Sequence, residues 1–103
     1  MRHIAPTDGN QAEIVTALRE AGASVQPLHA VGGGCPDLLI GLRGVNFLIE
    51  VKDGSRSPSR RRLTPDEADW HTAWRGQVIV VTCVEDALDL LWAVLPGTTA
   101  RRL

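Results

Sequence analysis

The sequence predicts a single α/β domain in which a central mixed sheet is flanked by helices. Two apolar runs on either side of Arg43-Gly44 are typical of a β-hairpin. Helix-start signals occur at Asn10, Thr64 and Thr82, and strand-like runs fill much of the chain between them. The 103 residues suffice for one core and indicate one domain over the whole chain.

The first predicted helix begins after Asn10. Asn10 is the expected N-cap, Glu13 lies three residues later as a capping-box partner, and Gly22 ends the helix. Its apolar stripe consists of Ile14, Val15, Leu18 and Ala21. A strand is predicted over residues 24–30, and Pro27 indicates that this strand lies at an edge of the sheet.

The hairpin comes next, and its turn sets which residues face each other. A turn symmetric about Arg43-Gly44 pairs residues whose numbers add up to 87, so Asp37 faces Glu50. Lys52 lies two residues beyond Glu50 and therefore on the same face. Because the hairpin is apolar on both faces, we expect it in the middle of the sheet, covered by helices.

A polar segment over residues 53–62 is predicted to be a mobile loop. The next helix has the clearest start in the chain, with Thr64 as N-cap, Pro65 at the first position and Glu67 completing a capping box. A buried strand over 77–82 follows, and Thr82 with Glu85 is expected to cap a last helix ended by Pro96-Gly97. The predicted order is α-β-β-β-α-β-α, with frayed tails at residues 1–9 and 98–103.

Composition and charge exclude several classes of protein. Apolar content and nearly balanced charge fit a soluble globular protein, with no apolar run of transmembrane length and no signal peptide. Cys35 and Cys83 lack zinc-type spacing and are expected to be reduced, so we expect a cytosolic protein and no membrane partner. A net charge of −1 argues against a uniformly basic DNA-coating protein.

The basic residues are nevertheless concentrated. Five basic residues against one acidic residue give residues 52–62 a net charge of +4, which leaves −5 for the rest of the chain. One interpretation is a solvated tether. We favour a phosphate-binding loop, because this segment leaves the strand that carries Glu50 and Lys52. The arginines concerned are Arg56, Arg60, Arg61 and Arg62.

Two interpretations of the facing acids compete. Directly opposed like charges destabilise a sheet unless something compensates them. In the first interpretation Lys52 neutralises one or both acids as a partly buried salt bridge. In the second, which we favour, Asp37 and Glu50 hold a Mg²⁺ ion, the Val51 carbonyl adds a ligand, and Lys52 orients or deprotonates an attacking water.

The pattern Pro36-Asp37 followed by Glu50-Val51-Lys52 on the next strand resembles the PD-(D/E)XK nuclease superfamily. The preceding Gly32-Gly33-Gly34 loop and the later Leu63-Thr64-Pro65 helix start look most like the virus-type replication-repair nuclease (VRR-NUC) domain. The resemblance covers residues from about Asn10 to about Leu95. It implies a restriction-endonuclease-like core.

The resemblance also implies a function. Aligned residues in that family bind Mg²⁺ or Mn²⁺ and hydrolyse phosphodiester bonds, and stand-alone members resemble dimeric Holliday-junction resolvases. The expected protein is thus a homodimeric DNA endonuclease acting on branched DNA, in a bacterial or phage-host cytoplasm. Many superfamily members place a first-helix glutamate beside the metal, so Glu13 is either a further ligand or only a capping residue.

Several residues keep open alternatives. Gly33 and Gly34 either let the backbone approach DNA, which we favour, or turn the chain into Pro36. Trp70 and Trp74 are expected in the core or a dimer surface rather than as base-stacking platforms, and His71 as a buried structural residue. The rival function is a non-catalytic nucleic-acid-binding or interaction module in which the charged triad is only a salt bridge.

Overall fold

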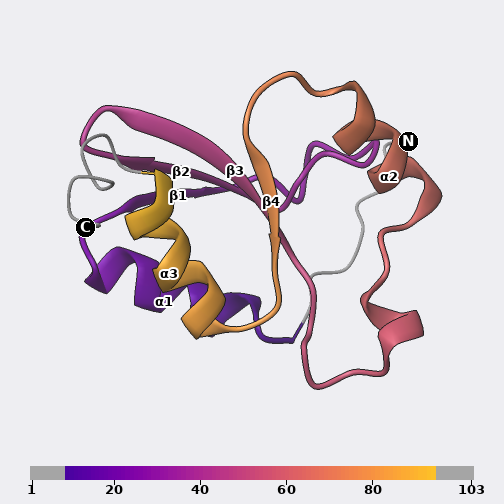
Figure 1. The fold of residues 1–103 in the computed structure, drawn as a ribbon, viewed down its shortest axis with the longest axis horizontal. Helices are drawn as coiled ribbons and strands as arrows, with labels where there is room; N and C mark the ends of the chain where they lie inside the picture. Colours follow the sequence, from indigo (N-terminus) through magenta and orange to yellow (C-terminus); the bar gives the residue numbers. More distant parts are fainter. Residues whose placement is uncertain (1–8, 95–103) are drawn as a thin grey trace.

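The computed structural model describes residues 9–94, and its order of helices and strands is the predicted one (Figure 1). A short 3-10 helix, η1, lies in the segment that was expected to be a loop. The predicted tails lie outside the described residues apart from Gly9, as does Pro96-Gly97. The elements are α1 (Gln11–Glu20), β1 (Ser24–Pro27), β2 (Leu38–Leu42), β3 (Val45–Val51), η1 (Pro58–Arg61), α2 (Pro65–Ala73), β4 (Val78–Val81) and α3 (Val84–Val94).

The four strands form one mixed sheet in the order β1-β2-β3-β4. The predicted hairpin register is confirmed, because Leu38 pairs with Ile49 and Leu42 pairs with Val45 in antiparallel β2 and β3. β1 lies at the edge, as Pro27 indicated, although it is shorter than predicted. β4 pairs with β3 in the parallel direction. The hairpin of β2 and β3 therefore lies between β1 and β4, in the middle of the sheet.

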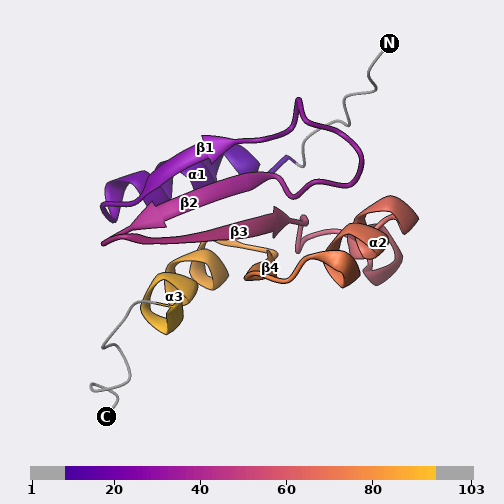
Figure 2. The same ribbon diagram turned by 90° about the horizontal axis from the view of Figure 1, so that it is seen from above.

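The hydrophobic core lies on one face of this sheet. Both α1 and α3 pack on that face and share one cluster with the strands, whose members include Ile14, Leu18, Leu38, Ile40, Phe47, Ile49, Ala87 and Leu91. Figure 2 shows α1 behind β1 and β2, and α3 beside β3 and β4. On the other face Leu39 and Val80 remain 37% and 40% exposed, so helices cover the hairpin mainly on its core face.

Two predicted helix caps differ from the structure. Asn10 occupies the N-cap position of α1 without a side-chain capping bond, so it forms no capping box with Glu13. Its buried amide instead donates to the carbonyls of Lys52 at 3.2 Å and Thr82 at 3.0 Å, which ties α1 to the ends of β3 and β4. The α3 helix begins two residues after Thr82, and the Thr82 hydroxyl bonds Asp86 rather than Glu85.

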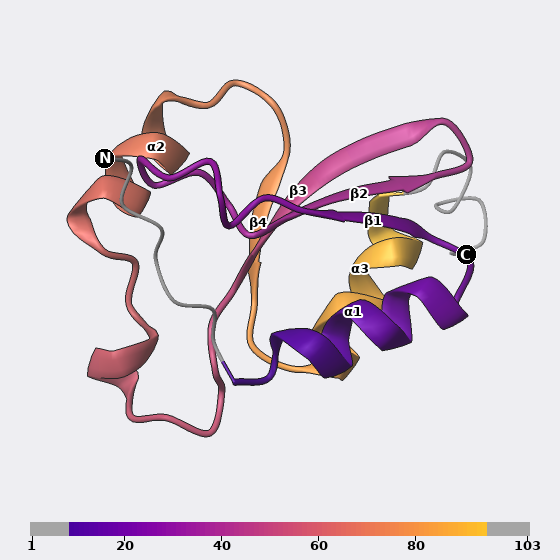
Figure 3. The ribbon, with the colours of Figure 1, turned by 180° about the vertical axis from the view of Figure 1, so that it is seen from behind.

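α2 lies beyond the carboxyl end of β3, away from the other two helices (Figures 1 and 3). Its predicted capping box is confirmed: the backbone N–H of Glu67 donates to the Thr64 hydroxyl at 3.2 Å, and the Glu67 carboxylate accepts from the backbone N–H of Thr64 at 2.8 Å. Pro65 stands at the start of the helix as predicted.

The glycine-rich loop before β2 packs against the start of α2. Gly34 has φ of +85°, and a Cβ atom there would lie 2.4 Å from the carbonyl oxygen of Asp66 and 3.0 Å from the backbone nitrogen of Glu67. Gly33 also has a positive φ, of +67°, but a Cβ atom would meet nothing within 4 Å. Close backbone packing therefore explains glycine at position 34, which sequence reasoning had related to DNA.

These two glycines form a matched pair for mutation. Gly33→Ala should cost about 1–2 kcal/mol of unfolding free energy, because only the left-handed backbone is penalised. Gly34→Ala adds a clash with rigid backbone, and we expect a further loss of about 1–3 kcal/mol. Urea unfolding of both variants measures the difference. Equal losses would show that the loop does not press on α2.

Candidate functional site

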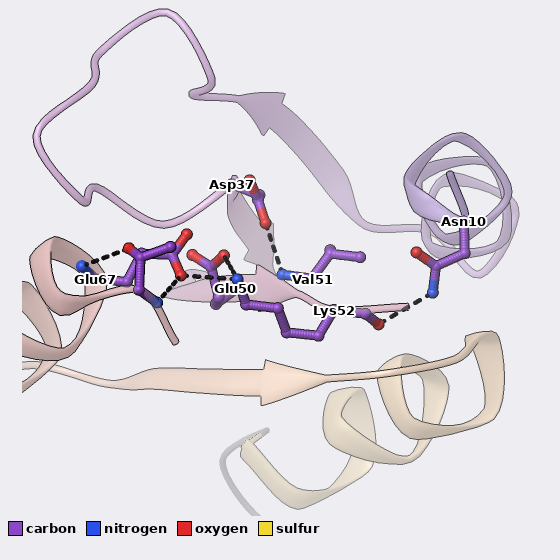
Figure 4. A network of polar contacts seen from close by, with 7 residues as sticks. Asn10, Asp37, Glu50, Val51, Lys52 and Glu67 are labelled. Carbon is purple, nitrogen blue, oxygen red and sulfur yellow. Dashed lines mark hydrogen bonds and ion pairs between the residues drawn. The ribbon is translucent and has the colours of Figure 1, made fainter. Parts of the chain in front are cut away.

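The candidate site lies where the carboxyl end of β3 meets the residue before β2. Asp37 precedes β2, and continuing the β2–β3 register by one residue places it opposite Glu50. Its carboxylate accepts a hydrogen bond from the backbone N–H of Val51 at 2.7 Å, while its carbonyl accepts one from Leu28 at 2.7 Å. Strand β3 and the loop after β1 thus hold Asp37 from two sides (Figure 4).

Glu50 is buried on the face of the sheet opposite the core and is only 2% exposed. Its Oε1 atom receives no hydrogen bond from any N–H or hydroxyl group in residues 9–94. Burial, the charge of Asp37 and the nearby Glu67 raise the pKa of Glu50 to about 9, although Lys52 acts in the opposite direction. A carboxylate in this position needs a cation or a proton.

Lys52 is also buried, at 8% exposure, and lies on the Glu50 face as predicted. Its Nζ atom is 2.7 Å from Glu67 Oε1 and 3.6 Å from Glu50 Oε2. The first contact is a hydrogen-bonded ion pair and the second is a looser electrostatic contact. Lys52 is therefore bound chiefly to a residue outside the predicted triad (Figure 4).

Glu67 is a member of the site that sequence reasoning missed. Burial opposes ionisation of Glu67, but hydrogen bonds from Lys52 and from the backbone N–H of Thr64 hold its pKa below the ordinary value. The sequence identified Glu67 only as a capping-box residue. No periodicity connects residues 52 and 67, because the intervening 53–62 segment carries α2 back over the end of β3.

The donor set suits a hard divalent cation with an incomplete protein shell. Asp37 and Glu50 supply two carboxylates, and Mg²⁺ commonly takes one or two carboxylates and completes its shell with water and phosphate oxygens. Within residues 9–94 no group of three or more His, Cys, Asp or Glu residues is placed to hold a metal. The orphaned Oε1 atom of Glu50 is the structural feature that fits such an ion.

The other predicted metal ligands are Glu13 and the backbone carbonyl of Val51. Glu13 is exposed on α1, and no hydrogen bond or ion pair in the described part of the chain joins it to Asp37 or Glu50. The side chain of Val51 is buried in the core, while its peptide N–H holds Asp37. Cys35 lies near the acids, since burial and then the charges of Glu50 and Asp37 raise its pKa. Both cysteines are free, as expected.

The basic segment follows the strand that carries Glu50 and leads into α2. Arg56 is exposed and forms a loose ion pair with Asp53 at 3.8 Å. Arg60 and Arg62 are exposed at η1, whereas Arg61 is half-buried. Gly33 is also exposed, in the glycine-rich loop.

The aromatic side chains of α2 do not form a core. Trp70 and Trp74 stack with ring centroids 4.6 Å apart, and Trp74 is 47% exposed. His71 is half-buried, its Nε2 atom has no partner among the described residues, and burial lowers its pKa. Trp74 lies on the surface and is therefore not a core residue. A place in a dimer surface and a role in base stacking both stay untested.

Comparison with known proteins agrees with the fold and the motif. No sequence family and no curated protein matches this chain. A solved structure described as a VRR_NUC domain matches it with a TM-score of 0.63 and 27% identity, over 87% of this chain and 100% of that one. No described helix combines the length and apolar character needed to cross a membrane. The chain has the fold of a VRR_NUC domain, and the resemblance predicted from Pro36-Asp37 and Glu50-Val51-Lys52 is confirmed.

Proposed function

We propose that this protein is a metal-dependent DNA endonuclease in which Asp37 and Glu50 hold Mg²⁺ or Mn²⁺. The observation that carries the proposal is the unequal pairing of Lys52, whose short ion pair goes to Glu67 and not to Glu50. A salt bridge that neutralised the triad would place the ammonium at hydrogen-bonding distance from Glu50, rather than at 3.6 Å. The Glu50 carboxylate, which lies opposite Asp37, therefore has the longer contact of 3.6 Å with the Lys52 ammonium.

The chain's own residues would each perform a distinct task. The bond from the Val51 N–H fixes the Asp37 carboxylate, and the Val51 carbonyl is a further candidate ligand. Lys52 would orient the attacking water or stabilise charge on the phosphate, because its ammonium lies beside Glu50. A bound divalent ion supplies positive charge that acidifies water and stabilises the phosphoryl oxygens in the transition state. Glu13 stays an untested candidate ligand.

DNA is the proposed substrate because the segment that follows the strand carrying Glu50 is strongly basic. Arg56, Arg60, Arg61 and Arg62 would contact phosphates beside the site, and the exposed Gly33 would allow the backbone to approach, with Gly34 behind it. Such contacts position DNA without reading its sequence. Each phosphate that is neutralised steepens the salt dependence of duplex binding by about 0.9 log units per log unit of salt.

The finer proposal is a homodimer that cuts branched DNA such as a Holliday junction. One site cuts one strand, so two symmetric cuts require two sites related by a two-fold axis. Support comes from the family resemblance and from apolar side chains on the uncovered sheet face, which a second copy would bury. The rival function remains a non-catalytic binding module of the same fold.

Isosteric substitutions test the proposed chemistry. Asp37→Asn, Glu50→Gln and Lys52→Met should each reduce Mg²⁺-dependent DNA cleavage by on the order of a hundredfold or more, because they remove a ligand or the ammonium. Cleavage in gels and Mn²⁺ titration by calorimetry are the measurements. Glu20→Gln, on the exposed surface of the same helix as Glu13, is the matched control and should stay active, whereas Glu13→Gln loses activity if Glu13 is a ligand.

The same assay separates the alternatives. The non-catalytic module predicts no cleavage and no Mn²⁺ binding by the wild-type protein. Four-way junctions, flaps and plain duplex serve as parallel substrates, and equal nicking of all three would contradict the junction preference. Full activity of Glu50→Gln would contradict the metal site.

A second prediction follows from the proton that Glu50 holds when no metal is bound. The pKa of Glu50 is raised above its value in the unfolded chain, so the folded state binds more protons and stability falls as pH rises toward about 9. In EDTA, thermal unfolding of the wild-type protein should occur at lower temperature at pH 9 than at pH 7. The difference should largely vanish in Glu50→Gln. An unchanged pH dependence in that variant would refute the assignment.

A further inference from the structure

Lys52 is the only lysine in the chain, in which all ten other basic residues are arginines. It is also buried, whereas Arg56, Arg60 and Arg62 on the following segment are exposed. A buried ammonium must be paired, since an unpaired one would cost several kcal/mol. The identity of its partner therefore decides what the ammonium can do.

The carboxylates of Glu67 and Glu50 both lie within reach of the Lys52 ammonium, and they are not equivalent. Glu67 Oε1 is 2.7 Å from Nζ, and Glu50 Oε2 is 3.6 Å away. The same Glu67 oxygen accepts the backbone N–H of Thr64 at 2.8 Å, so the capping box fixes the orientation of this side chain. The Glu67 carboxylate, in the first turn of α2, is therefore held in the orientation in which it binds Lys52.

The start of α2 is itself held against the site. Gly34 packs on the backbone of Asp66 and Glu67, in a loop that leads directly into Asp37. The loop that delivers one carboxylate therefore also sets the position of the helix that carries Glu67. For its capping role Glu67 needs only the backbone N–H of Thr64. That role explains neither the packing of Gly34 on α2 nor the ion pair with Lys52.

We propose that Glu67 is a positioning residue that holds the Lys52 ammonium away from Glu50 and so leaves the Glu50 carboxylate available to a divalent cation. This inference rests on the proposed function for its consequence, although the contact itself is independent of metal. Without the Glu67 charge, Lys52 would shift toward Glu50 and compete with the cation. Glu67 would also hold the ammonium in one position for a bound phosphate.

The decisive variant is Glu67→Gln. Glutamine has the same shape and completes a capping box, but it lacks the charge that balances Lys52. Asp66→Asn is the matched control, because it removes one negative charge from an exposed neighbour in the same helical turn. Thr64→Ala is a second control, which weakens the cap of α2 while leaving the Glu67 carboxylate in place.

The first measurement uses the metal-free protein and does not depend on activity. An amine-specific acylating reagent followed by peptide mass spectrometry reports on Lys52 alone among side chains, with the amino terminus resolved as a separate peptide. Glu67→Gln should label Lys52 several times faster than the wild type. Asp66→Asn and Thr64→Ala should label at the wild-type rate, provided that circular dichroism shows all variants to be folded.

The second measurement is a Mn²⁺ titration in a double-mutant cycle with Lys52→Met. Glu67→Gln should weaken Mn²⁺ binding roughly tenfold when Lys52 is present, and much less in the Lys52→Met background, because the two residues are coupled. An equal loss in both backgrounds would identify Glu67 as a metal ligand and overturn the positioning role. Wild-type labelling and Mn²⁺ affinity in Glu67→Gln would overturn it as well.

The two measurements also separate this inference from the proposed function. A wild-type protein that binds no Mn²⁺ and cuts no DNA overturns the proposed function. Lys52 labelling then still decides whether Glu67 holds the ammonium. Normal Mn²⁺ binding by the wild type with unaltered labelling in Glu67→Gln overturns the positioning role alone.

Discussion

The antiparallel register between β2 and β3 is the constraint on which the site depends. It continues from Leu38 opposite Ile49 to Asp37 beside Glu50, where the sheet ends. A shift of one residue would turn Glu50 and Lys52 into the core face and Val51 out of it. The apolar core and the acidic pair are therefore fixed by the same pairing, since alternate residues of β3 serve each of them.

Charge balance explains why the end of β3 differs from an ordinary buried salt bridge. The charges of Asp37, Glu67 and Lys52 all act on the buried Glu50 carboxylate. Lys52 makes its short ion pair with Glu67, and the Asp37 carboxylate accepts a hydrogen bond from the peptide N–H of Val51. Glu50 is buried, and its Oε1 atom accepts no hydrogen bond from residues 9–94, so a proton or a divalent ion would complete the balance. The fold of a VRR_NUC domain agrees with the second possibility.

Features carried by local pattern were predicted correctly. The symmetric turn at Arg43-Gly44 gave the hairpin register, and Thr64, Pro65 and Glu67 gave the start of α2. Features that depend on contacts between distant parts of the chain were not predicted. Asn10 is of a residue type that is common at N-caps. Its side-chain amide instead donates to the backbone carbonyls of Lys52 and Thr82, which are far from it in the sequence.

The same reason explains two further differences. Glu67 and Lys52 meet only because a long connection folds α2 over the end of β3, and a capping motif gives no sign of that second role. The sequence of the hairpin is apolar on both faces, so it could not predict that α1 and α3 pack on the same face. Sequence reasoning therefore identified the acidic pair, and the structure supplied the residue that balances its lysine.

The most direct test of the account is a crystal structure of the wild-type protein grown with Mn²⁺ and measured at a wavelength at which manganese scatters anomalously. We predict an anomalous peak between the carboxylates of Asp37 and Glu50, with the Lys52 ammonium still bonded to Glu67. A structure with no such peak, in which Lys52 bridges Asp37 and Glu50 instead, would contradict the account.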